Sequence, residues 1–229
     1  MKRSFDPAVL EMMDRPQPVS AELERDLESL RQLNRWFGSY RLILGFMRRW
    51  IKPSARMRVV DLATGSGDIP RLIADYARKI GARVQIDALD RQHATLEVAT
   101  KLSNSYPEIS YCEGNILECN SGGDYDVVLC TLVLHHFSDE DAVSLLRRSR
   151  ELSRRFVLVS DLRRGFFLRA SVYLLTALIF RETMTRYDAR LSAERAFSFS
   201  EMRDLAVRAG WGNFGHERFR FARQAIWLE

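Results

Sequence analysis

The 229-residue chain is expected to fold as an α/β protein with a doubly wound, mostly parallel sheet. Three observations predict this class. From residue 56 onward, short β-branched runs alternate with helical patterns, the order that gives a parallel sheet covered by helices on both faces. The first run passes through a glycine turn directly into an amphipathic helix. With 46% hydrophobic residues, the chain can bury one substantial core, which fits one domain with additions better than two.

The first 54 residues are expected to form an arm and a helical cap. Residues 1–19 contain three prolines and should be irregular, apart from one or two helical turns. Ser20 is a suitable N-cap, and leucines follow it at helical spacing. A second helix, apolar on one side and basic on the other, should cover residues 40–51 and end before Pro53.

The stretch Arg58–Asp68 has the pattern of a strand, a turn and a helix start. Because Gly65 and Gly67 lack a Cβ atom, the turn can take positive φ, and backbone N–H groups can approach a ligand closely. The spacing Asp61-x-Ala63-x-Gly-x-Gly differs from the Gly-x-Gly-x-x-Gly that holds a dinucleotide pyrophosphate. Alone, such a turn could equally be only a tight turn. It indicates a nucleotide-like cofactor only together with the segments that follow.

The next strand, Val84–Asp90, ends in an acid. In a doubly wound sheet, ligands lie at the carboxyl ends of the strands, and an acid about twenty residues beyond the glycine loop binds a ribose. The carboxylate of Asp90 can accept hydrogen bonds from both ribose hydroxyls, each worth roughly 1.5 to 3 kcal/mol. Alternatively, Asp90 caps the following helix. The ribose interpretation supports a nucleoside cofactor without deciding which one.

The remaining elements continue the alternation of strands and helices. Strands are expected over Ile109–Gly114, Tyr125–Cys130, Arg155–Leu162, 214–221 and 222–228, and helices over 142–152 and 199–211. Residues 163–199 are longer than a crossover between two strands requires, and their first half is apolar on several sides. We therefore expect a helical lid inserted there, because pockets for small organic ligands are mostly apolar.

This order of motifs resembles the class I S-adenosylmethionine (SAM) methyltransferases over about residues 55–162 and 198–229. Their first motif is usually Asp/Glu-x-Gly-x-Gly-x-Gly, and Ala63 stands here at its first glycine. Asp-Tyr-Asp entering the fourth strand, Leu-His-His after it, and Leu-Ala-x-x-Ala-Gly-Trp near the C-terminus are further matches.

The resemblance implies a Rossmann-like, seven-stranded, mostly parallel sheet whose last strand runs antiparallel beside the fifth. It divides the chain into an arm and helical cap (1–54) and a SAM-binding methyltransferase domain (55–229), with the lid at about 163–199. It also implies SAM as cofactor. The cofactor-binding residues expected from it are Asp61, Ala63, Thr64, Gly65, Ser66, Gly67, Asp90, Arg91, Asn115, Ile116, Thr131 and Leu132.

One of these positions departs from the family pattern. After the third strand the family commonly has Gly-Asp and an apolar residue, the acid meeting the adenine amine and the apolar side chain packing on the ring. Asn115 replaces the acid here, and its amide oxygen can still accept from the amine, without the charge.

His135 and His136 follow the fourth strand, where the resemblance places the methyl group. One imidazole, with an ordinary pKa near 6.5, can remove a proton from a substrate hydroxyl, a role worth roughly 10² to 10⁴ in rate. We favour His136 slightly. Alternatively, the pair caps the helix that begins near Ser138 or packs against the pocket wall. No metal is expected, because a zinc site needs more ligands, and His93 and His216 have no spacing relation to the pair.

The acceptor is expected to be small and largely apolar. An apolar lid and a histidine base favour the oxygen of a phenol, quinol or polyketide-like compound, as in quinone-biosynthesis and polyketide-tailoring methyltransferases. Asp161 could instead cap a helix, and Arg186 and Asp188 could form a surface ion pair of little energetic value. The substrate-binding residues expected are Trp36 and Tyr40 from the helical cap, Asp161 from the fifth strand, and Arg186 and Asp188 from the lid.

Three other functions stay open. An NAD-linked oxidoreductase would share the first strand, the turn and Asp90, but should show the longer glycine spacing and a hydride-transfer pair such as Tyr-Lys. A nucleic-acid methyltransferase is disfavoured because no Asn-Pro-Pro-Tyr-like segment follows the fourth strand. The net charge of +5 is also scattered among acids rather than gathered in a patch. The third is a non-catalytic SAM-binding protein.

The sequence indicates neither secretion nor a membrane span. Met1–Pro7 is not followed by an apolar h-region, and the longest apolar run, Val172–Phe180, is far shorter than the roughly 20 residues a bilayer requires. Cys112, Cys119 and Cys130 lack metal or disulfide-framework spacing. We expect a cytoplasmic protein with reduced thiols, a small-molecule substrate and no nucleic-acid partner. A homodimer stays open.

Overall fold

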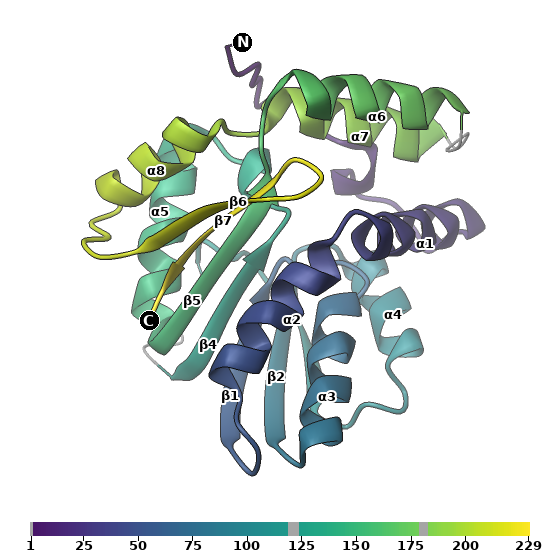
Figure 1. Cartoon of the computed structure of the whole chain (residues 1–229). Helices are drawn as coiled ribbons and strands as arrows, with labels where there is room; N and C mark the ends of the chain where they lie inside the picture. The colour runs from purple at the N-terminus through teal and green to yellow at the C-terminus, as the bar shows by residue number, and fades with distance from the viewer. Residues whose placement is uncertain (1, 119–123, 179–182) are drawn as a thin grey trace.

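The computed structural model describes residues 2–118, 124–178 and 183–229, and a seven-stranded sheet forms its centre (Figure 1). The strand order is β3-β2-β1-β4-β5-β7-β6. The first five strands pair in parallel, and β7 runs antiparallel between β5 and β6. The strands are β1 (Arg56–Leu62), β2 (Arg83–Asp90), β3 (Ile109–Glu113), β4 (Tyr125–Thr131), β5 (Ser153–Leu162), β6 (Gly215–Phe219) and β7 (Arg223–Leu228). The doubly wound sheet with a last strand antiparallel beside the fifth is confirmed.

Helices cover both faces of this sheet and its carboxyl edge. They are α1 (Ala21–Trp36), α2 (Ser39–Trp50), α3 (Asp68–Ile80), α4 (His93–Leu102), α5 (Asp139–Leu152), α6 (Phe166–Leu178), α7 (Thr183–Arg195) and α8 (Phe199–Arg208), with short 3-10 turns η1 (Met12–Asp14) and η2 (Leu134–His136). In Figure 1, α2 and α3 lie on one face and α5 and α8 on the other, while α6 and α7 lie side by side beyond the strand ends.

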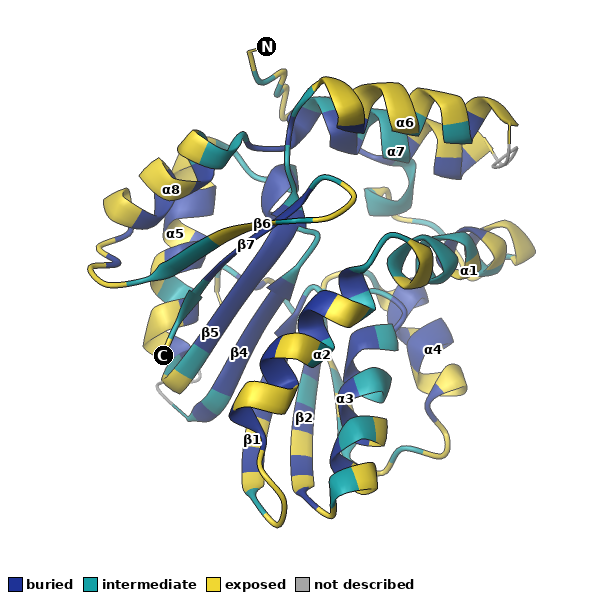
Figure 2. Cartoon of the chain, in the orientation of Figure 1, coloured by how far each residue is buried: buried dark blue, intermediate teal, exposed yellow. Residues whose placement is uncertain are grey.

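The central strands β1, β4, β5 and β7 are buried from both sides, because each face of the sheet has its own apolar layer. Along β4, Val128 and Cys130 pack with α5 and α8, while Val127 and Leu129 pack with α2 and α3. Successive strand side chains point to opposite faces, so this alternation divides the strand between the two layers. Figure 2 shows the resulting continuous dark-blue band through the central strands.

Hydroxyl side chains determine where three helices begin. The Ser20 hydroxyl accepts from the backbone N–H of Leu23, as expected for α1. Ser138 accepts from the N–H of Asp141 in the same way, so α5 begins at Asp139, three residues before the predicted start. At α8, Ser198 and its partner three residues on form a capping box.

Cys130 is buried in the sheet, and this burial raises the pKa of its thiol well above the ordinary value. Cys112 is exposed on β3, and Cys119 lies outside the described residues. In the described ranges, no helix has both the length and the apolar composition that crossing a bilayer requires.

Two glycines outside the turn that follows β1 are expected to respond oppositely to alanine. At Gly45 in α2, a Cβ would meet nothing within 4 Å. At Gly215 in β6, a Cβ would lie 2.0 Å from the indole Cε2 of Trp227 on β7. In urea denaturation, Gly45→Ala should raise the free energy of unfolding by about 0.4 to 1 kcal/mol. Gly215→Ala should lower it by about 1 to 3 kcal/mol, and a Gly215→Ala protein as stable as wild type would contradict this packing.

Candidate active site

A cavity of about 660 Å³ lies at the carboxyl end of the parallel strands, where doubly wound sheets bind their ligands. Its polar side is formed by the turn after β1, the end of β2 and the segment after β4. Its apolar side comes from α1, α6, α7 and the turn between β6 and β7. The N-terminal arm also reaches this cavity, through Glu11, Met13 and Asp14. The cavity is large enough for a cofactor and a small organic molecule.

The glycine turn has the left-handed backbone that its sequence predicts. Gly65 and Gly67 have φ of +55° and +71°, and Ala63 also takes a positive φ, +59°. This left-handed conformation is strained for alanine, so position 63 requires a positive φ as well as a small side chain. A Cβ on Gly67 would lie 2.0 Å from the Tyr111 hydroxyl oxygen, whereas a Cβ on Gly65 would meet nothing within 4 Å. Gly65 is therefore required by its φ, and Gly67 also by close packing.

Asp90 ends β2 beside this turn. One carboxylate oxygen accepts from the backbone N–H of Gly65 at 2.8 Å, and the other accepts from the N–H of Gln92 at 3.0 Å. Burial raises the pKa of Asp90, although these hydrogen bonds act in the opposite direction. Asp90 thus joins the glycine turn to the start of α4 and presents its carboxylate to the cavity.

The predicted cofactor residues divide into two groups. Those that line the cavity are Asp61, Ala63, Thr64, Gly65, Ser66, Asp90, Thr131 and Leu132; those that do not are Gly67, Arg91, Asn115 and Ile116. Arg91 forms an ion pair with Asp14 at 3.1 Å. Asn115 bonds within its own turn, to the Leu117 N–H and to Glu118, and Ile116 is buried in the core. Gln92 and Thr95 line the cavity instead, and the sequence analysis missed both.

Asn34 and Tyr40 show how the helical cap meets the turn. Both donate hydrogen bonds to one oxygen of Asp68, the first residue of α3. The Tyr40 hydroxyl is thereby held outside the cavity, although Asn34 lines it. Trp36, the other aromatic residue predicted to bind substrate, is 54% exposed and also lies outside the cavity.

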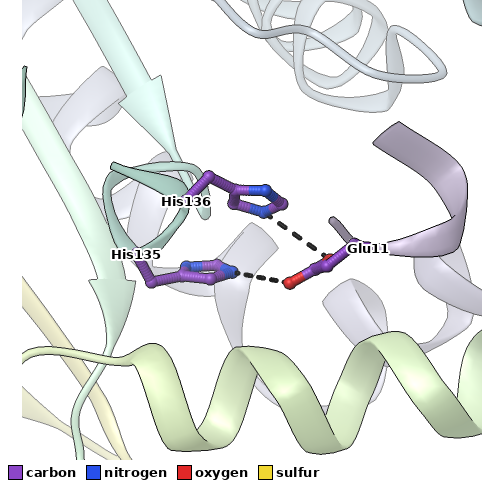
Figure 3. Close-up of side chains that lie close together, drawn as sticks. All are labelled: Glu11, His135 and His136. Carbon is purple, nitrogen blue, oxygen red and sulfur yellow. Dashed lines mark ion pairs between the residues drawn. The ribbon is translucent and has the colours of Figure 1, made fainter. Parts of the chain in front are cut away.

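The two histidines are each fixed by a carboxylate behind them. Nδ1 of His135 lies 2.7 Å from Asp161, which also accepts from the backbone N–H of His135. Nδ1 of His136 lies 2.7 Å from Asp14. Both imidazoles line the cavity, and their remaining nitrogens face the carboxylate of Glu11 (Figure 3). Asp161 was predicted to contact substrate; it lies behind His135 and does not line the cavity.

The local charges distinguish the two imidazoles. Burial lowers the pKa of His136, but the carboxylates of Glu11 and Asp14 more than offset this and raise it to about 9. Burial in turn raises the pKa of Asp14, whereas His136 and Arg91 lower it to about 2. His136 therefore holds its proton at neutral pH. This disfavours His136, the residue preferred from sequence, as the base.

The polar residues predicted on the lid lie elsewhere. Arg186 is exposed on α7 and outside the cavity. Asp188 accepts from the backbone N–H groups of Met12 and Met13, at 2.6 and 3.0 Å, so it anchors the arm. Burial raises the pKa of Asp188 to about 7. The alternative to substrate binding, a surface ion pair between Asp188 and Arg186, does not fit either, because the Asp188 carboxylate is buried and bonded to the arm.

The arm itself is the part of the site that sequence reasoning missed. Arg3 donates to the carbonyl oxygens of His135 and Phe137, at 3.2 and 2.6 Å, and thus fixes the histidine turn from outside. Glu11 and Asp14 then reach the imidazoles. No local signal marks these residues, because they lie in a proline-containing stretch without periodicity.

The buried carboxyl of Asp61 should make stability depend on pH. Burial raises its pKa to about 7, although the hydrogen bond donated by the Thr64 hydroxyl lowers the pKa in part. The folded protein thus keeps a proton that the unfolded chain releases near pH 4, so stability falls as the pH rises from about 4 to about 7. We expect Asp61→Asn to gain stability over wild type across this range, by up to about 4 kcal/mol.

This prediction can be checked by thermal and urea unfolding at several pH values without cofactor. Asp75→Asn, which changes an exposed carboxylate on α3, is the control and should show no such trend. An Asp61→Asn difference that is constant from pH 4 to pH 8 would contradict the raised pKa.

Comparisons with known proteins agree with this geometry. Residues 59–155 match a family model described as a methyltransferase domain. A 2-phytyl-1,4-naphthoquinone methyltransferase of Thermosynechococcus vestitus is 32% identical over 68 residues, which are 30% of this chain and 29% of that protein. The chain thus spans under a third of this curated relative.

Solved structures extend the likeness to nearly the whole fold. A candidate O-methyltransferase of Nostoc punctiforme matches with a TM-score of 0.65 and 19% identity, covering 90% of this chain and 59% of that one. The SAM-dependent methyltransferase SibL matches with a TM-score of 0.63 and 17% identity, covering 87% and 56%. The CMeT domain of the citrinin polyketide synthase matches with a TM-score of 0.59 and 12% identity, covering 79% of this chain and 48% of that one. At these identities, the matches establish the fold.

Proposed function

We propose that this chain, which has the class I methyltransferase fold and a methyltransferase domain over residues 59–155, transfers a methyl group from SAM to a small acceptor. We take the acceptor atom to be the oxygen of a phenol, quinol or polyketide-like compound. One observation carries the proposal: the same cavity joins the glycine turn and Asp90 to the histidine pair. A nucleoside and a hydroxyl-bearing molecule can therefore meet in it.

The cofactor half of the cavity fits SAM. The two oxygens of Asp90 accept backbone hydrogen bonds from Gly65 and Gln92 and keep capacity for a ribose hydroxyl. The Thr131 hydroxyl is buried at the cavity and has no hydrogen-bond partner among the described residues, so it is available to a ligand. When bound, SAM would supply a methyl group on a sulfonium, whose departure leaves a neutral thioether. The protein's task is thus to orient the acceptor and exclude water.

The other half of the cavity favours an apolar acceptor. Its wall is formed by Leu27, Leu30, Leu33 and Phe37 near α1, by Phe167, Leu168, Val172 and Leu175 on α6, and by Phe219 and Phe221 before β7. These side chains can bury a ring or a short aliphatic chain by the hydrophobic effect. The imidazoles of His135 and His136 line the same cavity and can act on a hydroxyl of such a molecule.

His135 is the better base of the pair. Asp161 accepts from Nδ1–H of His135, which leaves the lone pair of Nε2 directed into the cavity. A carboxylate behind an imidazole fixes this tautomer and stabilises the imidazolium that forms when Nε2 takes a proton. His136 does not have this role, because the carboxylates of Glu11 and Asp14 raise its pKa and keep it protonated.

Calorimetric titration with S-adenosylhomocysteine, with NADH as the control, tests the cofactor. We expect micromolar affinity for the former and none for the latter. Radiolabelled SAM would then be offered with phenols, quinols and a DNA or RNA oligonucleotide, and label should enter only the small acceptors. Preferential binding of NADH would contradict the proposal, and cofactor binding without transfer to any acceptor would favour a non-catalytic SAM-binding protein.

A further inference from the structure

Glu11, His135 and His136 turn their donor atoms toward a common point at the cavity (Figure 3). Oε1 of Glu11 lies 3.9 Å from Nε2 of His135, and Oε2 of Glu11 lies 3.7 Å from Nε2 of His136. These separations are too long for hydrogen bonds and a little longer than the roughly 3.4 Å between two ligands of a tetrahedral zinc ion. The Ser192 hydroxyl donates to Glu11 at 2.7 Å and fixes its carboxylate. A small inward shift would bring all three donors onto one ion.

Both imidazoles are prepared to act as ligands. Asp161 holds Nδ1 of His135 and Asp14 holds Nδ1 of His136, each at 2.7 Å. A carboxylate at Nδ1 takes the N–H of the neutral ring, so Nε2 keeps its lone pair. Metal-binding histidines usually have this outer partner, which sets the tautomer and raises the basicity of the ligand.

The charges around the cluster also favour a cation. Glu11, Asp14 and Asp161 bring three carboxylates into a largely buried site. Two guanidiniums are near them: Arg91 is paired with Asp14, and buried Arg223 lies in the field of Asp161. These carboxylates hold the proton on His136 in the free protein, and a bound metal ion would take the place of that proton.

We propose that Glu11, His135 and His136 bind a divalent transition-metal ion, with zinc the best fit, whose open position takes the acceptor hydroxyl. Two imidazoles and one carboxylate are a ligand set of catalytic zinc sites, which keep a fourth position for water or substrate. Magnesium and calcium prefer oxygen ligands, so they fit this set less well. Over the described parts of the chain, this is the group of converging His, Cys, Asp or Glu donors that can hold an ion.

This inference rests on the proposed function and changes how the acceptor loses its proton. A hydroxyl coordinated to the ion becomes more acidic; its O–H bond breaks, the proton passes to water, and the electron pair stays on oxygen. That oxygen takes the methyl group, and the electrons of the broken sulfur–carbon bond remain on sulfur. The imidazoles then serve as ligands, and neither has to be a free base.

Zinc binding by the full-length chain tests the site. Protein stripped with a chelator would be titrated with zinc by calorimetry, and with cobalt(II) by absorption spectroscopy, which reports coordination number. We expect one equivalent in a four- or five-coordinate site. Glu11→Gln, His135→Gln and His136→Gln should each weaken binding by about tenfold or more. His93→Gln is the matched control, since His93 is an exposed imidazole beside Glu97 and Glu113, and it should change nothing.

S-adenosylhomocysteine binding by the same samples separates the outcomes. Glu11 lies on the arm outside the sheet, so Glu11→Gln should keep cofactor binding while it loses zinc. Zinc binding that survives Glu11→Gln and His136→Gln, or that disappears in His93→Gln, would overturn the assignment. Full transfer activity in the stripped protein would also overturn it and leave His135 as the base. Zinc bound at this site without any cofactor binding would instead refute the proposed function and keep the metal site.

Discussion

Replacing Asp161 by asparagine is expected to lower kcat for methyl transfer about 10²- to 10⁴-fold while leaving S-adenosylhomocysteine affinity nearly unchanged. Asp161 accepts from both Nδ1 and the backbone N–H of His135. An asparagine side chain has one acceptor oxygen. If it serves the backbone, its NH₂ group faces Nδ1 and the imidazole must move its proton to Nε2. In that tautomer Nε2 can neither accept a proton nor bind a metal ion.

The pKa of Asp161 supports this strong coupling. Burial alone raises it, but the interaction with the His135 side chain and the backbone N–H groups of Leu162 and His135 more than offset burial and hold it below its usual value. Asp126→Asn is the control: Asp126 accepts from the Arg58 N–H far from the cavity, and its loss should leave kcat unchanged. A kcat–pH profile and KM should be measured together. A loss confined to KM, or none at all, would contradict a positioning role for Asp161.

Asp90→Asn should weaken S-adenosylhomocysteine binding about 10- to 100-fold. Asparagine is the same size but carries no charge and has one acceptor oxygen, so it cannot serve the Gly65 N–H, the Gln92 N–H and a ribose together. Loss of one charge-assisted hydrogen bond costs roughly 1.5 to 3 kcal/mol, and each 1.4 kcal/mol is tenfold in affinity. Calorimetry measures the change directly.

Asp87→Asn provides a matched comparison. Asp87 lies on the same strand, where it pairs with Arg58 and accepts from the Tyr125 hydroxyl, and it does not line the cavity. This variant should bind S-adenosylhomocysteine like wild type. Equal losses in both variants would mean that the effect comes from damage to β2 and not from contact with a ribose.

Local patterns predicted the strands of the sheet well. Each strand bound lies within two residues of its expected position, because β-branched runs and the turn between β1 and α3 carry their own signals. Position along a strand was also enough to bring Asp90, Thr131 and the histidines to one edge. Asn115 failed to reach the cavity because its side chain bonds within its own turn, which spacing alone does not reveal.

The contacts of the lid and of the N-terminal arm could not be predicted in the same way. Arg186 and Asp188 are two positions apart on α7 and therefore point in different directions, one outward and one to the arm. The contact between Asp14 and His136 joins residues 122 positions apart, from a segment with no periodic pattern. Tertiary packing determines such pairings. The sequence therefore predicted the two histidines but not the carboxylates that contact them.

The attachment of the arm to α7 also bears on the order of folding. Buried Arg195, at the end of α7, donates to the carbonyl oxygens of Asp6 and Val9. The N-terminal arm can therefore dock only after α7 has formed. Contacts of such long sequence separation close large loops and are expected to form late. During synthesis, a growing chain can therefore shape its glycine turn long before Glu11 and Asp14 dock. The contacts of Glu11 and Asp14 with His135 and His136 are therefore expected to form only once translation has passed α7.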